Sequence, residues 1–394
     1  MKAGLTFSLS LICSCMMHAQ AAESACTEQD AANCSPQSAI AQTPTPSLRD
    51  LLDKGKDKLA NKLYGLQLSA FGDAHSNYSD SGKQMFEWGV FEVDAAIDSG
   101  AELQGAMAIV TDKNKTTIPV AFLDYHTFGG LIAPRGRLWA EKGFHLQAGR
   151  FDVPFGNDWQ FYASKDSVSI SRPLTTELVM EGGYNDIGIR ALGNNGTFNF
   201  NTFLLRGFNR GQLLGGRLGV TPFSDPFSLK NAKDPKTFEI GLSYLYDADK
   251  AWNKNESAFA IDSEGHLSAW TARFEYIVRS KNPLLSDGAT RQTGWHFTQE
   301  FALPESVAWP TTVFVRYEKA ALRPSEISDP EIGTNAGDGH DARIAAGFST
   351  NLGNADLLLW KFEIQHYLRA TPSTREMPGY RHENLLFTQL VLTL

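Results

Sequence analysis

Short segments in which apolar and polar residues alternate recur throughout residues 64–394, and this alternation constrains the fold more than any other feature. Ile240 and Leu242, for example, alternate with Glu239 and Ser243. Successive side chains of a β-strand point to opposite faces, so a period of two indicates strands with one apolar and one polar face. The same pattern recurs in residues 91–98, 270–279, 313–318 and 360–365. We therefore expect an all-β fold.

A soluble β-sandwich would also alternate, with its apolar faces turned inward. Two properties favour a membrane barrel. Aromatic residues stand near strand ends, as in interfacial girdles, and many segments reach the ~9–11 residues of a tilted spanning strand. No fixed repeat period indicates a β-helix or a propeller. The sequence therefore predicts a transmembrane, antiparallel, up-and-down β-barrel.

The number of strands follows from the alternating segments and the turn residues between them. Fifteen can be assigned: 64–74, 86–98, 101–111, 117–128, 144–151, 186–192, 198–208, 216–221, 237–246, 268–280, 294–303, 311–319, 342–350, 356–368 and 385–394. A single-chain barrel with both ends in the periplasm needs an even number. We therefore predict sixteen strands, with fourteen as the fallback, and expect the missing strand within 139–143 or 167–180.

The N-terminal region differs from the rest. Residues 1–21 are typical of a cleaved signal peptide, because a lysine precedes a short apolar run and a small-x-small site. Residues 22–46 are rich in Ala, Gln, Ser, Thr and Pro, and predict a disordered periplasmic linker. Residues 47–63 predict a short amphipathic helix. Residues 64–394 form the barrel, which we expect in the bacterial outer membrane. A lipid anchor on Cys15 is a weaker alternative.

Two cysteines, Cys26 and Cys34, follow the predicted cleavage site. In an oxidising compartment they are candidates for a disulfide bond, which the barrel would not need for folding. No Cys/His pattern of a zinc site occurs. The stretch 338–341, Asp-Gly-His-Asp, is a weak candidate for calcium, and we expect His126, His296 and His366 to face the lumen or an interface rather than a metal.

Composition and motifs exclude several function classes. The formal net charge of −8 has no basic half, so no electrostatic footprint for nucleic acid exists. The sequence lacks GxSxG, HExxH and a phosphate-binding glycine loop. We therefore expect neither an enzyme nor a bound cofactor.

The polar strand faces and the longest gap between strands provide candidates for a pore lining. Pro154 should end a strand, and residues 157–183 are long enough to fold into the pore, although an ordinary extracellular loop remains an equal alternative. We expect the constriction to oppose Arg150 and Arg172 to acidic residues such as Glu92 and Asp94. The full set of candidates is Glu92, Asp94, Arg150, Arg172, Arg190, Glu239, Arg273, Glu275, Arg316, Glu318, Lys361 and Glu363.

One segment resembles a known family. Residues 147–156, QAGRFDVPFG, are similar to the "GRF-x-x-PFG" segment of the phosphate-selective porins (porins O and P). Residues 171–174, 184–189, 215–222 and 315–318 and the closing strand fit the same group in order. The resemblance implies an outer-membrane porin. Two departures stand against this pattern: the predicted lumen mixes acids with bases where the family has ladders of Arg and Lys, and residue 394 is Leu where an aromatic is usual.

Two function classes remain open. The first is a water-filled channel for passive diffusion of small hydrophilic solutes or ions. The second is a substrate-specific uptake barrel or receptor without a plug domain, for example for a siderophore. Residues 22–63 are too short for a plug, which favours diffusion. Outer-membrane lipid, lipopolysaccharide and small solutes are the expected partners, and a homotrimer is left open against a monomer.

Overall fold

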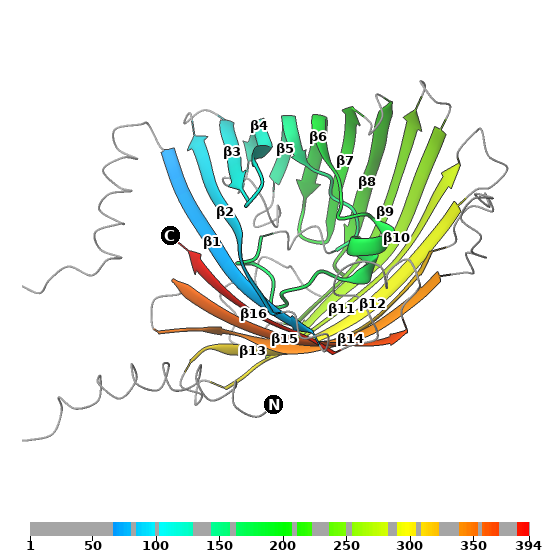
Figure 1. The fold of residues 1–394 in the computed structure, drawn as a ribbon. Helices are drawn as coiled ribbons and strands as arrows, with labels where there is room; N and C mark the ends of the chain where they lie inside the picture. The colour runs from blue at the N-terminus through cyan, green and yellow to red at the C-terminus, as the bar shows by residue number, and fades with distance from the viewer. Residues whose placement is uncertain are drawn as a thin grey trace, which may run out of the picture. The chain divides into compact units, whose positions relative to one another are not determined.

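The computed structural model describes residues 66–79, 84–98, 102–128, 143–157, 163–206, 211–222, 236–249, 254–282, 290–304, 309–322, 339–353, 357–369 and 384–393. The predicted signal peptide, linker, helix, Cys26 and Cys34 lie outside these residues, as does Asp338 of the calcium candidate. Within them, sixteen strands form one closed barrel (Figure 1). The prediction of an antiparallel up-and-down barrel of sixteen strands is confirmed.

The strands run in chain order around the barrel. They are β1 (Leu66–Ser79), β2 (Gln84–Asp98), β3 (Leu103–Thr111), β4 (Thr116–Phe128), β5 (Gly143–Asp152), β6 (Asn185–Asn194), β7 (Phe198–Arg206), β8 (Gln212–Val220), β9 (Lys236–Asp249), β10 (Lys254–Leu267), β11 (Trp270–Asn282), β12 (Thr290–Ala302), β13 (Thr311–Leu322), β14 (Gly339–Asn351), β15 (Leu358–Arg369) and β16 (Asn384–Thr393). β1 pairs with β16 from Phe71↔Thr393 to Ser79↔Leu385, which closes the barrel and leaves no sheet edge.

The strand that the sequence did not reveal is β10, and both places where we expected it are wrong. Residues 167–180 contain the short π-helix η2 (Thr175–Val179) rather than a strand, and Gly143 begins β5. β10 alternates weakly because Ala258 and Ala260 face inward, where polar residues were expected. Phe259, Ile261 and Leu267 mark its apolar outer face.

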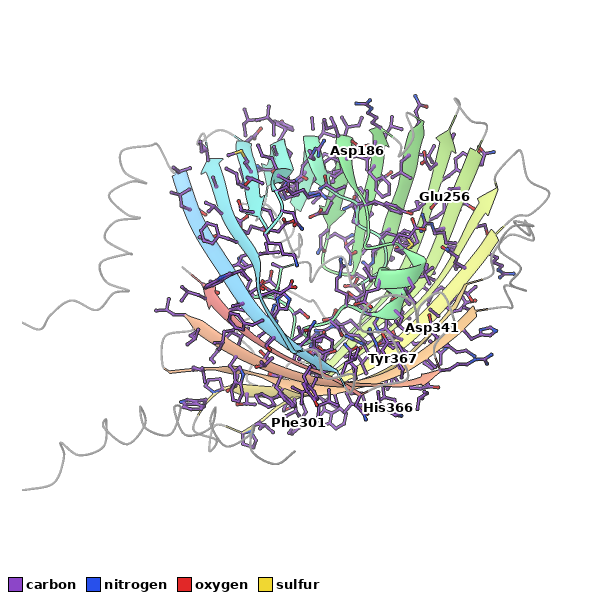
Figure 2. All side chains as sticks on the ribbon, in the orientation of Figure 1. Asp186, Glu256, Phe301, Asp341, His366 and Tyr367 are labelled. Atoms are coloured by element: carbon purple, nitrogen blue, oxygen red, sulfur yellow. The ribbon has the colours of Figure 1, made fainter. Side chains whose placement is uncertain are left out.

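The outer face of the barrel is apolar and the inner face is largely charged. Ile240, Leu242 and Ile364 are 42%, 46% and 44% exposed, as residues facing lipid should be. Lys361 and Glu363, which lie on β15 like Ile364, are fully buried on the inner face. Figure 2 shows the same division, with Asp341 and Tyr367 inside the barrel and Phe301 and His366 outside it.

Aromatic pairs stand at both ends of the outer face. Phe86 and Trp88 lie 6.5 Å apart at the start of β2, and Trp270 and Phe301 lie 5.8 Å apart at the opposite end, where β11 starts. Such belts match the two water–lipid interfaces of a membrane. Among the described residues, no helix is both long and apolar enough to cross a membrane.

The described parts of the long connection between β5 and β6 run inside the barrel (Figure 1). Gly149 lies in β5 shortly before this connection: its φ of +143° suits glycine, and a Cβ there would lie 2.3 Å from the Ala121 carbonyl oxygen. Beyond Asp152 the chain leaves β5, as Pro154 predicted. We call residues 153–157 and 163–184 the infolded segment.

The infolded segment packs on an apolar part of the inner wall. Its own Val153, Phe155, Leu174 and Val179 are buried in one cluster with inward side chains of β2 to β11 and of β13. On β3 to β8, where apolar residues are most numerous, these side chains include Ala106, Ala108, Val120, Phe122, Leu192, Phe203, Leu205 and Leu213. The expectation of a polar inner face throughout is therefore wrong for this part of the barrel, because the segment covers it.

Candidate functional site

The infolded segment is bound through its backbone to carboxylates on the inner wall. The N–H groups of Ile170 and Ser171 donate to Oε2 of Glu363 at 2.7 and 2.9 Å, and the N–H of Leu174 donates to Oε2 of Glu318 at 2.6 Å. Charge-assisted hydrogen bonds of this kind are about twice as strong as neutral ones. The segment therefore lies in the lumen, as one of our two alternatives predicted.

Two arginines complete this anchor. Nε of Arg343 and Nε of Arg316 donate to the same Oε1 of Glu318 at 2.7 and 3.1 Å. Arg343 also donates to the carbonyl oxygen of Arg172 at 2.8 Å. Burial raises the pKa of Glu177 in η2, and Arg343, 3.4 Å away, opposes that shift. The result is a network of opposite charges that joins the segment to three neighbouring strands, β13, β14 and β15.

A second anchor holds the beginning and the end of the segment on β11. Glu275 accepts hydrogen bonds from the N–H of Asn157 at 2.6 Å and from Oγ1 of Thr175 at 2.8 Å. Arg279 donates to the carbonyl oxygen of Val179 at 2.8 Å. Both ends of the segment are therefore fixed on the same strand.

A third anchor lies towards β1 and β15. Lys361 donates to the carbonyl oxygens of Ser164 and Ser167, and Oγ of Ser164 donates to Asp73 at 2.9 Å. Nζ of Lys165 lies 3.9 Å from Asp94. Because β11 and β1 are far apart around the barrel, the segment crosses the lumen between them.

Arg150 does not face the lumen, so its predicted place at the constriction is wrong. Its partners across the sheet are Ala121 and Ile187, and Ile187 is 50% exposed on the outer face. Cross-strand partners point to the same face of a sheet, so Arg150 points outward. Lys165 is the cation that meets Asp94.

Most other predicted candidates are buried on the inner face. Glu92, Asp94, Arg190, Glu239, Glu275, Arg316, Glu318, Lys361 and Glu363 are buried there, and Arg273 is nearly so. Arg190 stacks on Phe151 at 4.3 Å and donates to Gln147, on the apolar part of the wall. Arg172 belongs to the segment itself, and its guanidinium donates a hydrogen bond to the carbonyl oxygen of Gly182.

Several inward charges were missing from the predicted set. Arg217 donates to Asp262 at 2.5 Å and lies 2.8 Å from Glu239, and Arg273 pairs with Glu300. Glu264, Arg279 and Arg343 also face inward. Strict alternation would have placed Arg217, Arg279 and Arg343 on the inner face, since each has an apolar residue next to it in its own strand.

The buried charges of the described inner wall are mostly negative. Fourteen carboxylates are buried: Asp73, Glu92, Asp94, Asp124, Asp152, Glu239, Asp247, Asp262, Glu264, Glu275, Glu300, Glu318, Asp341 and Glu363. Six cations are buried with them: Arg190, Arg217, Arg279, Arg316, Arg343 and Lys361. The wall therefore carries an excess of negative charge in the described residues.

A cleft lies between the infolded segment and the wall of β11, β12 and β13. It is lined by Asn157, Ser167, Val168, Ser169, Pro173, Arg273, His296, Thr298, Glu300 and Arg316. The lining combines hydroxyl, imidazole and charged groups, which is the polar surface that a hydrated solute needs.

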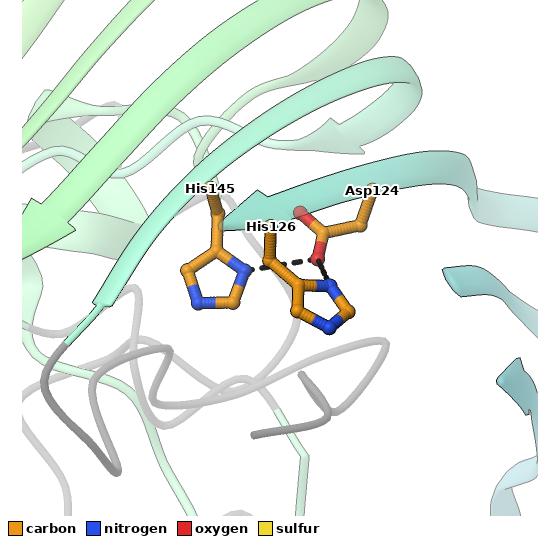
Figure 3. Close-up of side chains that lie close together, drawn as sticks. All are labelled: Asp124, His126 and His145. Atoms are coloured by element: carbon orange, nitrogen blue, oxygen red, sulfur yellow. Dashed lines mark hydrogen bonds and ion pairs between the residues drawn. The ribbon is translucent and has the colours of Figure 1, made fainter. Parts of the chain in front are cut away.

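A separate group of side chains lies on the inner face of β4 and β5 (Figure 3). Nδ1 of His145 and Nδ1 of His126 approach the same Oδ2 of Asp124, at 2.9 and 3.2 Å. His126 and His145 are direct cross-strand partners, with ring centroids 5.5 Å apart. Among the described residues, these three could together hold a metal ion.

Comparison with known proteins supports the fold. No protein family and no curated protein matches the sequence. Among solved structures, the anion-selective porin from Comamonas acidovorans matches with a TM-score of 0.58 at 11% identity, over 84% of this chain and 99% of that chain. A loop L8 deletion mutant of OmpT, an outer membrane protein of Vibrio cholerae, matches with a TM-score of 0.57 at 10% identity, over 84% and 99%.

OprB of Pseudomonas putida matches with a TM-score of 0.55 at 11% identity, over 87% of this chain and 97% of that chain. The chain therefore has the fold of outer-membrane porins. This likeness extends to the porin fold in general and not to the phosphate-selective group that residues 147–156 resemble.

Proposed function

We propose that this protein is an outer-membrane porin, a water-filled channel through which small hydrophilic solutes and ions diffuse. The observation that carries the proposal is a closed barrel of sixteen strands with an apolar outer face and a charged inner face. Barrels of 16–18 strands leave an aqueous channel. The infolded segment narrows that channel, and its three anchors make it a fixed constriction.

The charge of the wall supports a preference for cations. Fourteen buried carboxylates face six buried cations among the described residues, and the arginines on β8, β11, β13 and β14 are bonded to acids. A ring of fixed negative charge attracts cations and repels anions. A phosphate channel would need arginines and lysines available to the solute, so this balance favours cations over the phosphate selectivity that the sequence resemblance implies.

Export and assembly belong to the same proposal. A cleaved signal peptide at residues 1–21 would deliver the chain to the outer membrane, where lipid and lipopolysaccharide would cover the apolar face. Homotrimers remain a proposal for its assembly. A solved form of OmpT of Vibrio cholerae is described as a trimer, and that chain shares the fold at 9% identity.

Planar-bilayer recording of the purified full-length chain tests the function. We expect stepwise conductance in KCl and, under a KCl gradient, a reversal potential of the sign that indicates K⁺ permeation over Cl⁻. Absence of conductance from a chain with heat-modifiable gel migration would reject the channel. A reversal potential of the opposite sign would reject the cation preference alone.

A further inference from the structure

We propose that Asp124, His126 and His145 form a binding site for a divalent transition-metal ion on the lumenal wall. The inference goes beyond solute diffusion and does not depend on it. Two imidazoles and one carboxylate form a ligand set that suits ions of the Zn²⁺, Ni²⁺ and Cu²⁺ class, whereas Mg²⁺ and Ca²⁺ prefer oxygen ligands alone.

The positions of the ligand atoms fit such an ion. One ligand atom from each of the three residues lies within 4.8 Å of the other two, and the two contacts to Oδ2 of Asp124 are 2.9 and 3.2 Å. Zinc bonds of about 2.0–2.1 Å place neighbouring ligands of a tetrahedral site about 3.3–3.4 Å apart. A small outward movement of the side chains would therefore admit the ion.

The strands hold these side chains in place without a metal. Asp124 and His126 are two residues apart on β4 and therefore share the inner face, and His145 is the direct partner of His126 on β5. The group lies near the end of the barrel where β4 ends and β5 begins. This is the opposite end of β5 from the infolded segment, so the group is separate from the constriction.

Asp124 provides an independent indication of a ligand. Its side chain is fully buried, and its second oxygen, Oδ1, has no hydrogen-bond partner among the described residues. A buried carboxylate oxygen without a partner carries a desolvation cost that a metal ion would remove. Arg190 lies close enough to interact with Asp124 electrostatically, but its own hydrogen bonds go to Gln147 and the Asp152 carbonyl.

The lumen provides access to the site. The side chain of His126 remains 13% exposed, against 7% for His145, so a coordination position can be reached from the water side. Three protein ligands leave a fourth position of a tetrahedral ion for water or an incoming solute. The negative wall raises the local concentration of cations at this position.

Equilibrium dialysis of the full-length chain without an added histidine tag, against graded ZnCl₂, tests the site. We expect binding of Zn²⁺ that is weakened at least tenfold in the double variant H126A/H145A. The matched control is H266A. His266 also contacts a carboxylate, with its Nε2 2.6 Å from Oε1 of Glu264, but among the described residues it belongs to no group of three possible metal ligands. This control should bind as the wild type does.

Equal zinc binding by the wild type and the double variant would overturn the proposal. So would displacement of Zn²⁺ by an equal concentration of Mg²⁺, since that would indicate a site of oxygen ligands. Should the double variant fail to fold by heat-modifiable migration, visible spectra of the wild type with Co²⁺ decide. Intense bands of low-coordinate cobalt support the site, and the weak spectrum of aqueous Co²⁺ overturns it.

Discussion

The inner faces of β3 to β8 and of β11 to β15 contact the same infolded segment, but they offer it different side chains. The first group presents apolar residues such as Val120, Phe122 and Phe203, which belong to one buried cluster with Phe155 and Leu174. The second presents carboxylates and arginines that bind the segment through backbone hydrogen bonds. The apolar residues bury nonpolar surface of the segment, and the hydrogen bonds to charged groups fix the direction and position of the segment.

The difference shows how a segment without regular structure can stay inside a channel. Backbone groups away from water must find partners, and the carboxylates of β11, β13 and β15 provide them for Asn157, Leu174 and Ile170. The apolar side chains of β3 to β8 cannot serve as donors or acceptors, and the segment buries its own apolar side chains in one cluster with them. The two halves of the wall are therefore complementary to different parts of one segment.

The largest expected effect comes from breaking the charged half with Glu318→Gln. The change removes the negative charge that Arg316 and Arg343 share and puts an amide N–H₂ in place of one carboxylate oxygen, and breaking a buried ion pair in this way costs about 3–5 kcal/mol. We expect a lower midpoint of urea unfolding and noisier, larger channel conductance. Glu87→Gln is the control, because Glu87 pairs with Lys113 at an exposed edge, where such pairs contribute about 0–1 kcal/mol. Equal effects of both variants would contradict the anchor.

The apolar packing of the infolded segment is tested by Leu174→Ala. Leu174 is fully buried in the cluster, and truncating such a residue costs about 2–5 kcal/mol. Leu178→Ala is the control, since Leu178 in the same π-helix is only partly buried. Urea unfolding should show the larger loss for Leu174→Ala. A larger loss of stability for Leu178→Ala would contradict the account, because Leu178 and not Leu174 would then make the main contact with the wall.

The contrast between inner and outer faces is tested by Ile364→Arg. Ile364 is 44% exposed on β15, and arginine facing lipid near mid-membrane costs about 2–4 kcal/mol. Leu368→Arg, near the end of the same strand, should cost about 0–1 kcal/mol because it lies closer to the interface. Refolding into lipid vesicles measures both. If Ile364→Arg were tolerated, the outer face at this position would have to contact water rather than lipid.

The smallest effect concerns selectivity. Lys165→Gln removes a cation that meets Asp94 in the lumen, so the reversal potential should shift towards stronger cation preference. Arg150→Gln is the control, because Arg150 points outward by its register with Ile187. Bilayer recordings of both variants should separate them. A shift for Arg150→Gln without one for Lys165→Gln would reverse the assignment of faces.

Alternation predicted most of the barrel but only part of its interior. It placed Glu318 and Arg316 on one face, since both are two residues apart in a strand that also carries exposed Val315 and Tyr317. It missed β10, because inward Ala258 and Ala260 do not alternate in polarity with their neighbours. The rule of a polar inner face fails where apolar side chains of the infolded segment cluster with the wall.

The partners within the site depend on register, which a single strand does not reveal. Arg150 follows the glycine of a strand that bends, so only its pairing with Ala121 and Ile187 shows that it points outward. The approach of His145 to Asp124 likewise requires the pairing of β4 with β5. The infolding of residues 157–183 was one of two alternatives, and the hydrogen bonds to Glu318 and Glu363 decide between them.

Deleting residues 160–178 tests most directly the claim that the infolded segment narrows the channel. The deletion removes the backbone groups bound to Glu318, Glu363 and Lys361 while leaving all sixteen strands in place. The measurement is single-channel conductance of the folded variant in KCl, beside the wild type. Our account predicts a clear increase in conductance. An unchanged conductance would contradict it, because the segment would then lie outside the path of the ions.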